Sequence, residues 1–187
     1  MTVTLPRHRL TVADYHKMGE MGILSEDDRV EMIEGEIIDM APIGSAHAAC
    51  VRYLLHSFAP HLGEAAMLDI QNPLRLSDYS EPQPDMMLLK PRSDFYRRVH
   101  PQAQDVLLLV EVAETSVAYD REVKIPLYAC HQIPETWLFD LKAQRLEIFL
   151  DPSSEGYKKI LRPGRGERVA PGLLPEAIIN WAEALSN

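Results

Sequence analysis

Short apolar runs separated by turn residues predict most of the strands of this chain. Residues 29–34 and 36–40 alternate between apolar and polar positions on either side of a Glu34-Gly35 pair, which is typical of a β-hairpin. Residues 105–112 are almost continuously apolar, which is typical of a central strand buried on both faces. Further short strands are predicted at residues 66–70, 74–76, 85–89, 134–140, 145–150 and 157–161.

Helical periodicity fills much of the remaining sequence. Thr11 caps a predicted short helix that runs to Met18, and Ser45 opens an amphipathic helix that we expect to end at Pro60. Residues 119–131 also read as a helix, either starting near Lys124 with Pro126 in its first turn or kinked at the proline. The pattern of residues 175–185 predicts an amphipathic helix near the end of the chain. Helices between the early strands and a late strand meander predict an α/β fold with a mixed sheet flanked by helices.

Length and composition fit one globular domain. The chain has 187 residues, which predicts a single domain over 1–187 with its core at about 10–185. Its formal net charge of −9 argues against a basic nucleic-acid coat or a polybasic membrane anchor, but it leaves an acidic metal site open.

The cellular location follows from what the sequence lacks. The two cysteines, Cys50 and Cys130, give neither a disulfide framework nor zinc-type spacing. Residues 1–10 lack the apolar run of a signal peptide, and no stretch reaches the 18 or so apolar residues of a membrane span. We therefore expect a cytoplasmic protein that does not enter the membrane.

Two acidic residues belong to strongly apolar strands. Asp85 begins one predicted strand, and Glu111 lies near the end of the central one. A carboxylate in such a run is costly to bury unless a cation, a set of hydrogen-bond donors or a metal ion compensates it. Alternatively, Glu111 lies at the exposed end of its strand and pairs with an arginine or lysine.

Lys124 follows Glu111 by thirteen positions, on or just before the next helix. Two carboxylates can hold Mg²⁺ or Mn²⁺, which lowers the pKa of bound water, and a nearby lysine can stabilise charge developing on phosphorus. Together these three residues have the composition that metal-dependent phosphodiester cleavage needs. The spacing alone favours the alternative of an i,i+4 surface pair between Lys124 and Asp120.

In their order and spacing, several segments resemble the Uma-two family of endonucleases, which has the PD-(D/E)xK, restriction-endonuclease-like fold. The segments that carry the resemblance are Pro84-Asp85, Glu111-Val112, residues 119–128 and 133–140, the front segments 30–36 and 42–47, and the tail segments 156–157 and 171–175. No single motif is specific. The resemblance covers about residues 10–185.

The resemblance implies roles for individual residues. Asp85 and Glu111 would be metal ligands for Mg²⁺ or Mn²⁺, Lys124 the catalytic lysine, and Glu31 a further acid from the N-terminal hairpin. His47 also matches a family position, although a lone histidine in a helix is more often structural than a ligand. DNA would be the substrate, and restriction-type nucleases often cut duplexes as two-fold homodimers.

Two departures from the simplest form of the motif concern the strand that carries Glu111. The lysine of that form stands two residues after the acid, where this chain has Ala113. Glu114 stands where many relatives have a small or polar residue. If the strand continues to Ala113, alternation predicts that Glu114 points away from Glu111, and if it ends earlier, Glu114 adds negative charge near the site.

Basic residues gather in two segments of this acidic chain. Residues 90–100 hold four cations and one acid, and residues 157–168 hold five cations and one acid. Such segments can contact phosphates, and Phe95 or Tyr96 can stack on a base, but solvated loops explain them equally well.

Three functions remain open on the sequence alone. The first is a Mg²⁺- or Mn²⁺-dependent DNA endonuclease that uses Asp85, Glu111 and Lys124, with Glu31 nearby. The second is a binding or dimerisation module that keeps the nuclease fold without catalysis, and the third is a hydrolase of a smaller phosphoester.

Overall fold

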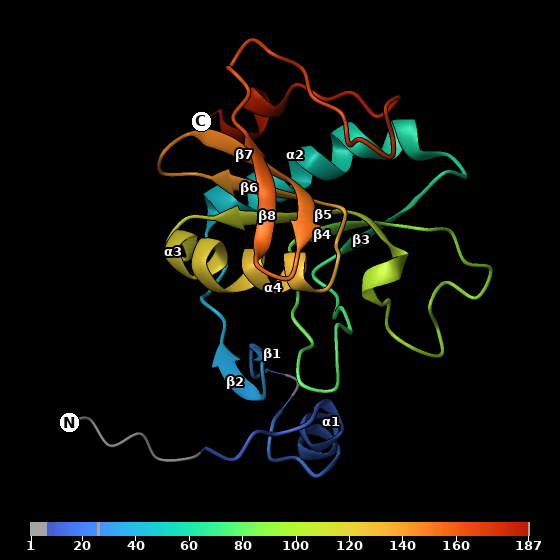
Figure 1. Cartoon of the computed structure of the whole chain (residues 1–187), viewed down its shortest axis with the longest axis vertical. Coiled ribbons are helices and arrows are strands. Elements are labelled where there is room, and N and C mark those ends of the chain that lie inside the picture. The colour runs from blue at the N-terminus through green and yellow to red at the C-terminus, as the bar shows by residue number, and fades with distance from the viewer. Residues whose placement is uncertain (1–6, 26, 187) are drawn as a thin grey trace.

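A six-stranded mixed sheet forms the centre of the protein, whose computed structural model describes residues 7–25 and 27–186. Its strands lie in the order β3-β4-β5-β6-β7-β8, with β5 and β6 parallel and all other neighbours antiparallel (Figure 1). The strands are β3 (Met67–Ile70), β4 (Met86–Leu89), β5 (Val106–Ala113), β6 (Glu135–Asp140), β7 (Arg145–Ser153) and β8 (Gly156–Leu161). Every one of these strands lies close to a run that the sequence pattern predicts.

Helices cover both faces of this sheet. The helical segments are α1 (Val12–Glu20), α2 (Ser45–Leu62), η1 (Ala103–Asp105), α3 (Val117–Tyr119), η2 (Asp120–Lys124), α4 (Ile125–Cys130) and η3 (Trp181–Leu185). On one face, α2 and η3 pack with Trp137 and Phe139 into the largest apolar cluster. On the other face, Tyr128 of α4 packs against Leu109 of β5. The α/β class with a helix-flanked mixed sheet is therefore confirmed (Figure 1).

The central strand β5 is buried along its whole length. Helix layers on both faces leave its side chains no route to solvent, which explains why its sequence is apolar in every position but one. That one position is Glu111, which is 2% exposed. The fold therefore places a carboxylate inside the protein.

A separate two-stranded hairpin and α1 lie below the main sheet in Figure 1. The hairpin consists of β1 (Val30–Ile33) and β2 (Glu36–Asp39). Its turn has positive φ angles at Glu34 and Gly35, and a side chain at Gly35 would collide with Arg9, so this position requires glycine. An antiparallel bridge between Met32 and Glu81 joins the hairpin to the segment that leads into β4.

Three predicted elements differ from the structure. Helix α2 continues past Pro60 to Leu62, because burial of Phe58 and Leu62 favours the helix. Pro60 cannot donate a hydrogen bond to the carbonyl of His56, but His56 is exposed, so water can bond that carbonyl. The predicted strand at 74–76 is reduced to a single bridge at Arg75, since the following turn bends the chain back on itself.

The predicted helix at 175–185 is the third difference. Only residues 181–185 are helical, as a 3₁₀ turn. Upstream, Ala177 and Ile179 are both buried, and Ile179 exchanges backbone hydrogen bonds with Val169. Burial of alternate residues against a neighbouring segment favours an extended chain, and it outweighs the helical pattern here.

The helical segment from 117 to 130 contains a π-turn at Asp120–Lys124. Pro126 lies in the first turn of α4 and cannot donate a backbone hydrogen bond, as one of the two sequence predictions had it. A π-turn inserts an extra residue into the helix and is frequent at functional sites. Here it ends at Lys124. None of the described helices is long and apolar enough to cross a membrane.

An ion-pair network holds the π-turn against the sheet. Glu147 of β7, which is 1% exposed, accepts hydrogen bonds from Arg121 at 2.5 and 3.1 Å and from Arg162 at 2.8 Å. Burial opposes ionisation of Glu147, but the two arginines outweigh it and hold the pKa of the carboxyl below its ordinary value of 4.5.

Replacing Glu147 with glutamine is expected to lower the free energy of unfolding by about 1 kcal/mol at pH 7. Because the folded-state pKa is depressed, the carboxylate stabilises the protein above pH 4.5, and this contribution is lost as the pH falls through the folded-state pKa. Urea unfolding at pH 7 and at about pH 3.5 measures the difference between the two proteins. Glu155→Gln, an exposed change on the following turn, is the control. An equal difference at both pH values would contradict the prediction.

Candidate active site

Strand pairing brings Asp85 and Glu111 together. Strands β4 and β5 are antiparallel with Met86 opposite Val110, so Asp85, directly before β4, lies beside Glu111. The backbone N–H of Val112 donates a hydrogen bond of 2.8 Å to Oδ2 of Asp85. The two acids that the sequence singled out thus meet at one end of the two strands.

Lys124 joins them from the end of the π-turn. Its Nζ lies 2.9 Å from Oε1 of Glu111 and 3.3 Å from Oε2 of Glu31, and the lysine side chain is 4% exposed. The surface-pair alternative for Lys124 is therefore wrong. The exposed position suggested for Glu111 is also wrong, but its pairing with a lysine is confirmed. Glu31, which only the resemblance suggested, lies in the same cluster.

Glu31 is fixed by its own hydrogen bonds. It is buried in β1, where its Oε2 accepts the backbone N–H of Gln83 at 3.0 Å and its Oε1 accepts the hydroxyl of Tyr119 at 3.2 Å. All four predicted residues, Asp85, Glu111, Lys124 and Glu31, line one cavity of about 400 Å³. The hairpin forms one wall of this cavity, and the helical segment from α3 to Lys124 forms another.

The electrostatics of the cavity are set by burial. Burial raises the pKa of Glu111 to about 8, helped by the negative charges of Asp120 and Asp85, while Lys124 and the Tyr128 hydroxyl at 2.5 Å act in the opposite direction. Burial alone would lower the pKa of Lys124, but Glu111 and Glu31 outweigh it and raise that pKa well above its ordinary value. The cavity therefore keeps a cation between two acids.

Asp85 behaves differently from Glu111. Burial opposes its ionisation, but the hydrogen bond and charge of His47 and the amide of Val112 outweigh burial and lower the pKa of Asp85. Nε2 of His47 lies 2.9 Å from Oδ1 of Asp85. Nδ1 of His47 is buried and has no hydrogen-bond partner among the described residues, so this atom is available for a further hydrogen bond. His47 is thus part of the cluster and not an isolated helical histidine.

Three other polar side chains of the cluster were not predicted as site residues, and the sequence had offered one of them, Asp120, only as a surface partner of Lys124. The Tyr128 hydroxyl donates a hydrogen bond to Glu111. Tyr128 follows Lys124 by four residues, and this i,i+4 spacing could have indicated that the two side chains share a face of the helix. Asp120 lines the cavity, with its pKa raised by burial and its Oδ2 accepting a 2.6 Å hydrogen bond from Ser116. Gln71 donates to Oδ1 of Asp85 at 3.2 Å, from a loop that no pattern connected to the site.

Strand alternation predicted that Glu114 points away from Glu111, but Glu114 lines the cavity instead. Strand β5 continues to Ala113 as expected, but it ends there, so Glu114 lies in a bend where alternation no longer applies. Its Oε2 would lie 2.9 Å from a side chain at Gly44, and Glu114 lines the same cavity as Glu111. Position 44 therefore leaves the carboxylate room because it is a glycine.

The donor set fits a hard divalent cation. Asp85 and Glu111 offer only carboxylate oxygens, and the charge of Asp85 raises the pKa of Glu111, a repulsion that a cation between them would relieve. Among residues 7–25 and 27–186, no three His, Cys, Asp or Glu side chains are spaced to hold a metal ion by themselves. Mg²⁺ usually takes one or two carboxylates and completes its shell with water and substrate phosphate, so two ligands suffice for it.

Comparison with known proteins places the chain in a family. The family model Uma2, described as "Putative restriction endonuclease", matches residues 12–182. A crystal structure of a "putative nuclease" from Anabaena variabilis has a similar fold, with a TM-score of 0.74 and 16% identity, covering 95% of this chain and 99% of that one. No protein of curated function matches the sequence significantly. Since the family model spans nearly the whole chain, this protein belongs to the Uma2 family.

Proposed function

We propose that this protein is a nuclease that hydrolyses phosphodiester bonds of DNA with the help of Mg²⁺ or Mn²⁺. The observation that carries the proposal is the meeting of Asp85, Glu111 and a buried Lys124 in one cavity. The Uma2 family description and the nuclease described for the similar structure support the same reaction class.

The reaction would be the addition of water across one P–O bond. The oxygen of a water molecule bonds to phosphorus, the bond from phosphorus to one ester oxygen breaks, that oxygen gains a proton, and the water gives up a proton to solvent. When bound by Asp85 and Glu111, the cation would polarise the phosphate and lower the pKa of the attacking water.

The side chains of the protein have separate tasks in this proposal. Lys124, whose raised pKa keeps it charged, faces the developing negative charge on phosphorus. Glu31 and Tyr128 hold the lysine and Glu111 in place through their hydrogen bonds and ion pairs. His47 orients Asp85.

Incubation with supercoiled plasmid DNA tests the proposal. We expect nicked or linear product with Mg²⁺ or Mn²⁺ and none with excess EDTA, because the two carboxylates repel each other and the phosphate unless a cation lies between them. A heat-denatured sample of the same protein controls for contaminating nucleases that survive heating. No cleavage with either metal would favour the non-catalytic binding module, and cleavage of mononucleotides alone would favour a hydrolase of small phosphoesters.

Two copies of the chain are part of the proposal. A chain with a single catalytic cavity cuts one strand at a time, so double-strand cleavage is simplest for a two-fold dimer that places one cavity on each strand. We therefore extend the proposal to a homodimer.

A further inference from the structure

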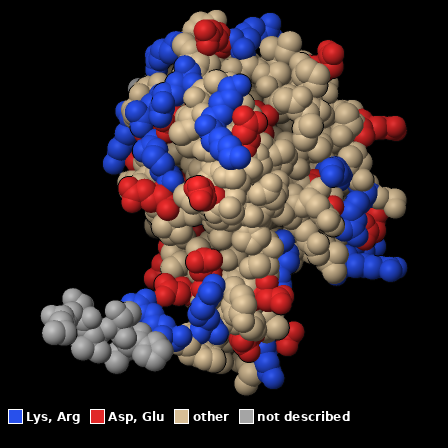
Figure 2. All heavy atoms as spheres, viewed as in Figure 1, with Lys and Arg blue, Asp and Glu red and all other residues tan. Residues whose placement is uncertain are grey.

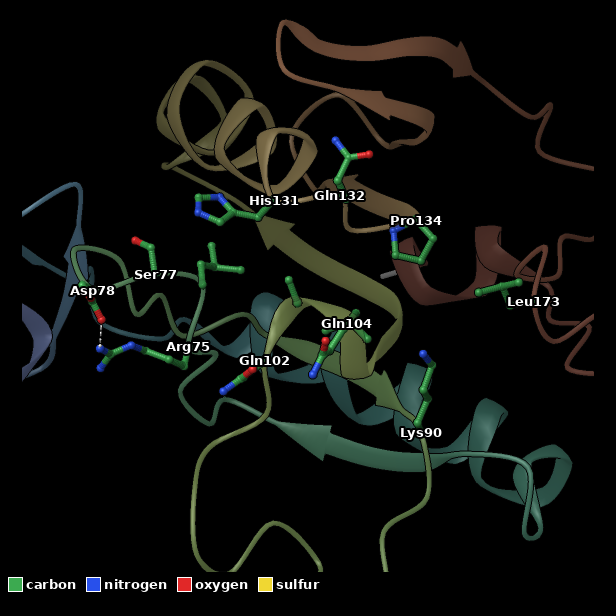
Figure 3. A pocket seen from close by; sticks show the side chains of 13 residues that line it. Arg75, Ser77, Asp78, Lys90, Gln102, Gln104, His131, Gln132, Pro134 and Leu173 are labelled. Atoms are coloured by element: carbon green, nitrogen blue, oxygen red, sulfur yellow. Dashed lines mark hydrogen bonds and ion pairs between the residues drawn. The ribbon is translucent and has the colours of Figure 1, made fainter.

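Two adjoining cavities lie outside the candidate active site. Their volumes are about 870 and about 590 Å³, and they share Arg75, Asp78 and Gln102, so we treat them as one trough. The first cavity is drawn in Figure 3. It lies at Val106 and His131, at the opposite ends of β5 and the α4 helix from Glu111 and Lys124.

The lining of the first cavity is rich in amides and cations. Figure 3 shows Gln102, Gln104 and Lys90 on one side of it and His131 and Gln132 on the other. Amide groups both donate and accept hydrogen bonds, and lysine and arginine neutralise phosphates. This lining differs from the mostly apolar lining of a typical small-molecule pocket. It suits a polyanion that also carries hydrogen-bonding groups.

The acids of the trough are already matched by cations. Asp78 lies 3.0 Å from Arg75, and Glu81 lies 3.8 Å from the same arginine and 2.5 Å from Nε2 of His16. Arg97 and Arg98 at the rim are exposed and form no ion pair within the described part of the chain. Positive charge is therefore left over at this edge of an acidic protein.

The loop that carries these arginines has an unusual backbone. Phe95 and Tyr96 have φ angles of 52° and 55°, a region that is strained for aromatic residues. Arg92 stacks 4.4 Å from the Tyr96 ring, and the Tyr96 hydroxyl bonds the carbonyl of Lys90 at 2.7 Å. These contacts hold a loop whose tip, Phe95, is 73% exposed. An exposed aromatic ring beside unpaired arginines is a common arrangement for stacking on nucleic-acid bases.

The trough lies within reach of the catalytic cavity. Glu81 lines the second cavity of the trough and Asp85 lines the catalytic cavity, and four residues of extended chain span at most about 14 Å. That distance is about four base-pair steps of DNA. The basic side chains at the right edge of Figure 2 lie over the loop that Figure 1 draws on that side.

We propose that the trough and the Arg97-Arg98 rim bind the DNA that flanks the cleaved phosphodiester bond. The inference rests on the proposed nuclease function, because the occupant is its substrate. It assigns the phosphate contacts of an acidic protein to one localised surface, separate from the residues that cut.

Binding of a labelled DNA duplex of about 30 base pairs tests this surface. The Asp85→Asn background keeps the probe intact and removes one negative charge from the catalytic cavity. On this background, Arg97→Ala/Arg98→Ala is expected to weaken binding about fivefold or more at low salt. The slope of log affinity against log salt should also become shallower by about two, since two phosphate contacts are lost. Fluorescence anisotropy over a salt series measures both quantities.

The matched control is Arg52→Ala. Arg52 is exposed on α2, forms no ion pair among the described residues, and lies on the other face of the sheet, outside both basic segments of the sequence. This variant should bind DNA as the background does. Equal binding by the rim variant and the Arg52→Ala control, absence of DNA binding by the background at low salt, or tighter binding of duplex RNA than of DNA would each overturn the proposal.

The two proposals fail separately. If the wild-type protein does not cleave plasmid but the rim variant loses DNA affinity, the nuclease proposal falls and the trough stands as a DNA-binding surface. If plasmid is cleaved and the rim variant binds normally, the trough assignment alone is wrong.

Discussion

Asp85→Asn is expected to reduce metal-dependent cleavage of plasmid DNA by at least about 100-fold. Changing a residue that only supports a metal ligand typically costs 10- to 100-fold, and Asp85 is proposed as a ligand itself. Asparagine has the same shape, and its side-chain oxygen can still accept the 2.8 Å hydrogen bond from Val112. The variant should therefore fold, and it loses the charge that a divalent cation needs.

Metal binding gives this prediction a second measurement. The wild-type protein should gain about 2.7 kcal/mol of stability at a Mn²⁺ concentration one hundred times the dissociation constant, and Asp85→Asn should gain much less. Thermal unfolding with and without Mn²⁺ compares the two proteins. Asp27→Asn, a change of the same type at an exposed position, should leave both cleavage and the metal response unchanged.

Cleavage at the wild-type rate by purified Asp85→Asn would show that this residue does not hold the cation. A loss of cleavage with a normal response to Mn²⁺ would move Asp85 from metal binding to another step. The two measurements together therefore separate a ligand from a residue that merely shapes the cavity.

The strands were predictable because their signal is local. The apolar run of β5 and the alternating hairpin at 30–39 each carry their own pattern, and the structure has both. The helix predicted at 175–185 failed for a non-local reason, since the pairing of Ile179 with Val169 is not encoded in the spacing of residues along that segment.

Some members of the candidate site were predictable from the sequence, but their contacts were not. Glu111 and Asp85 stand out because acids are costly in apolar strands. That Glu31 would reach Lys124 across 93 positions depends on the hairpin docking through the Met32–Glu81 bridge, and only the family resemblance pointed to it. The bend at Glu114 likewise depends on where β5 ends, which periodicity locates only approximately.

The buried lysine allows a test of how the cavity is stabilised. In the absence of divalent cations, Lys124→Met is expected to lower the free energy of unfolding by about 3–5 kcal/mol, because breaking a buried ion pair leaves its partners uncompensated. Glu111 and Glu31 would then face each other without the cation that now lies 2.9 and 3.3 Å from them. Urea unfolding in EDTA at about pH 9, where Glu111 with its pKa of about 8 is ionised, measures the loss, and Lys142→Met, at an exposed turn position, is the control.

A double-mutant cycle separates lost charge balance from lost packing. Glu111→Gln alone should cost less than Lys124→Met, since Lys124 keeps its contact with Glu31. The loss of unfolding free energy in the double variant Glu111→Gln/Lys124→Met should be about 1–3 kcal/mol smaller than the two single losses added together. The reason is that the double variant leaves only Glu31 without the lysine, and Gln83 and Tyr119 already donate hydrogen bonds to Glu31. Additive losses would mean that Lys124 stabilises the fold mainly through its methylene chain. The ion pair would then matter little to stability, and the cavity would tolerate its two acids without a cation.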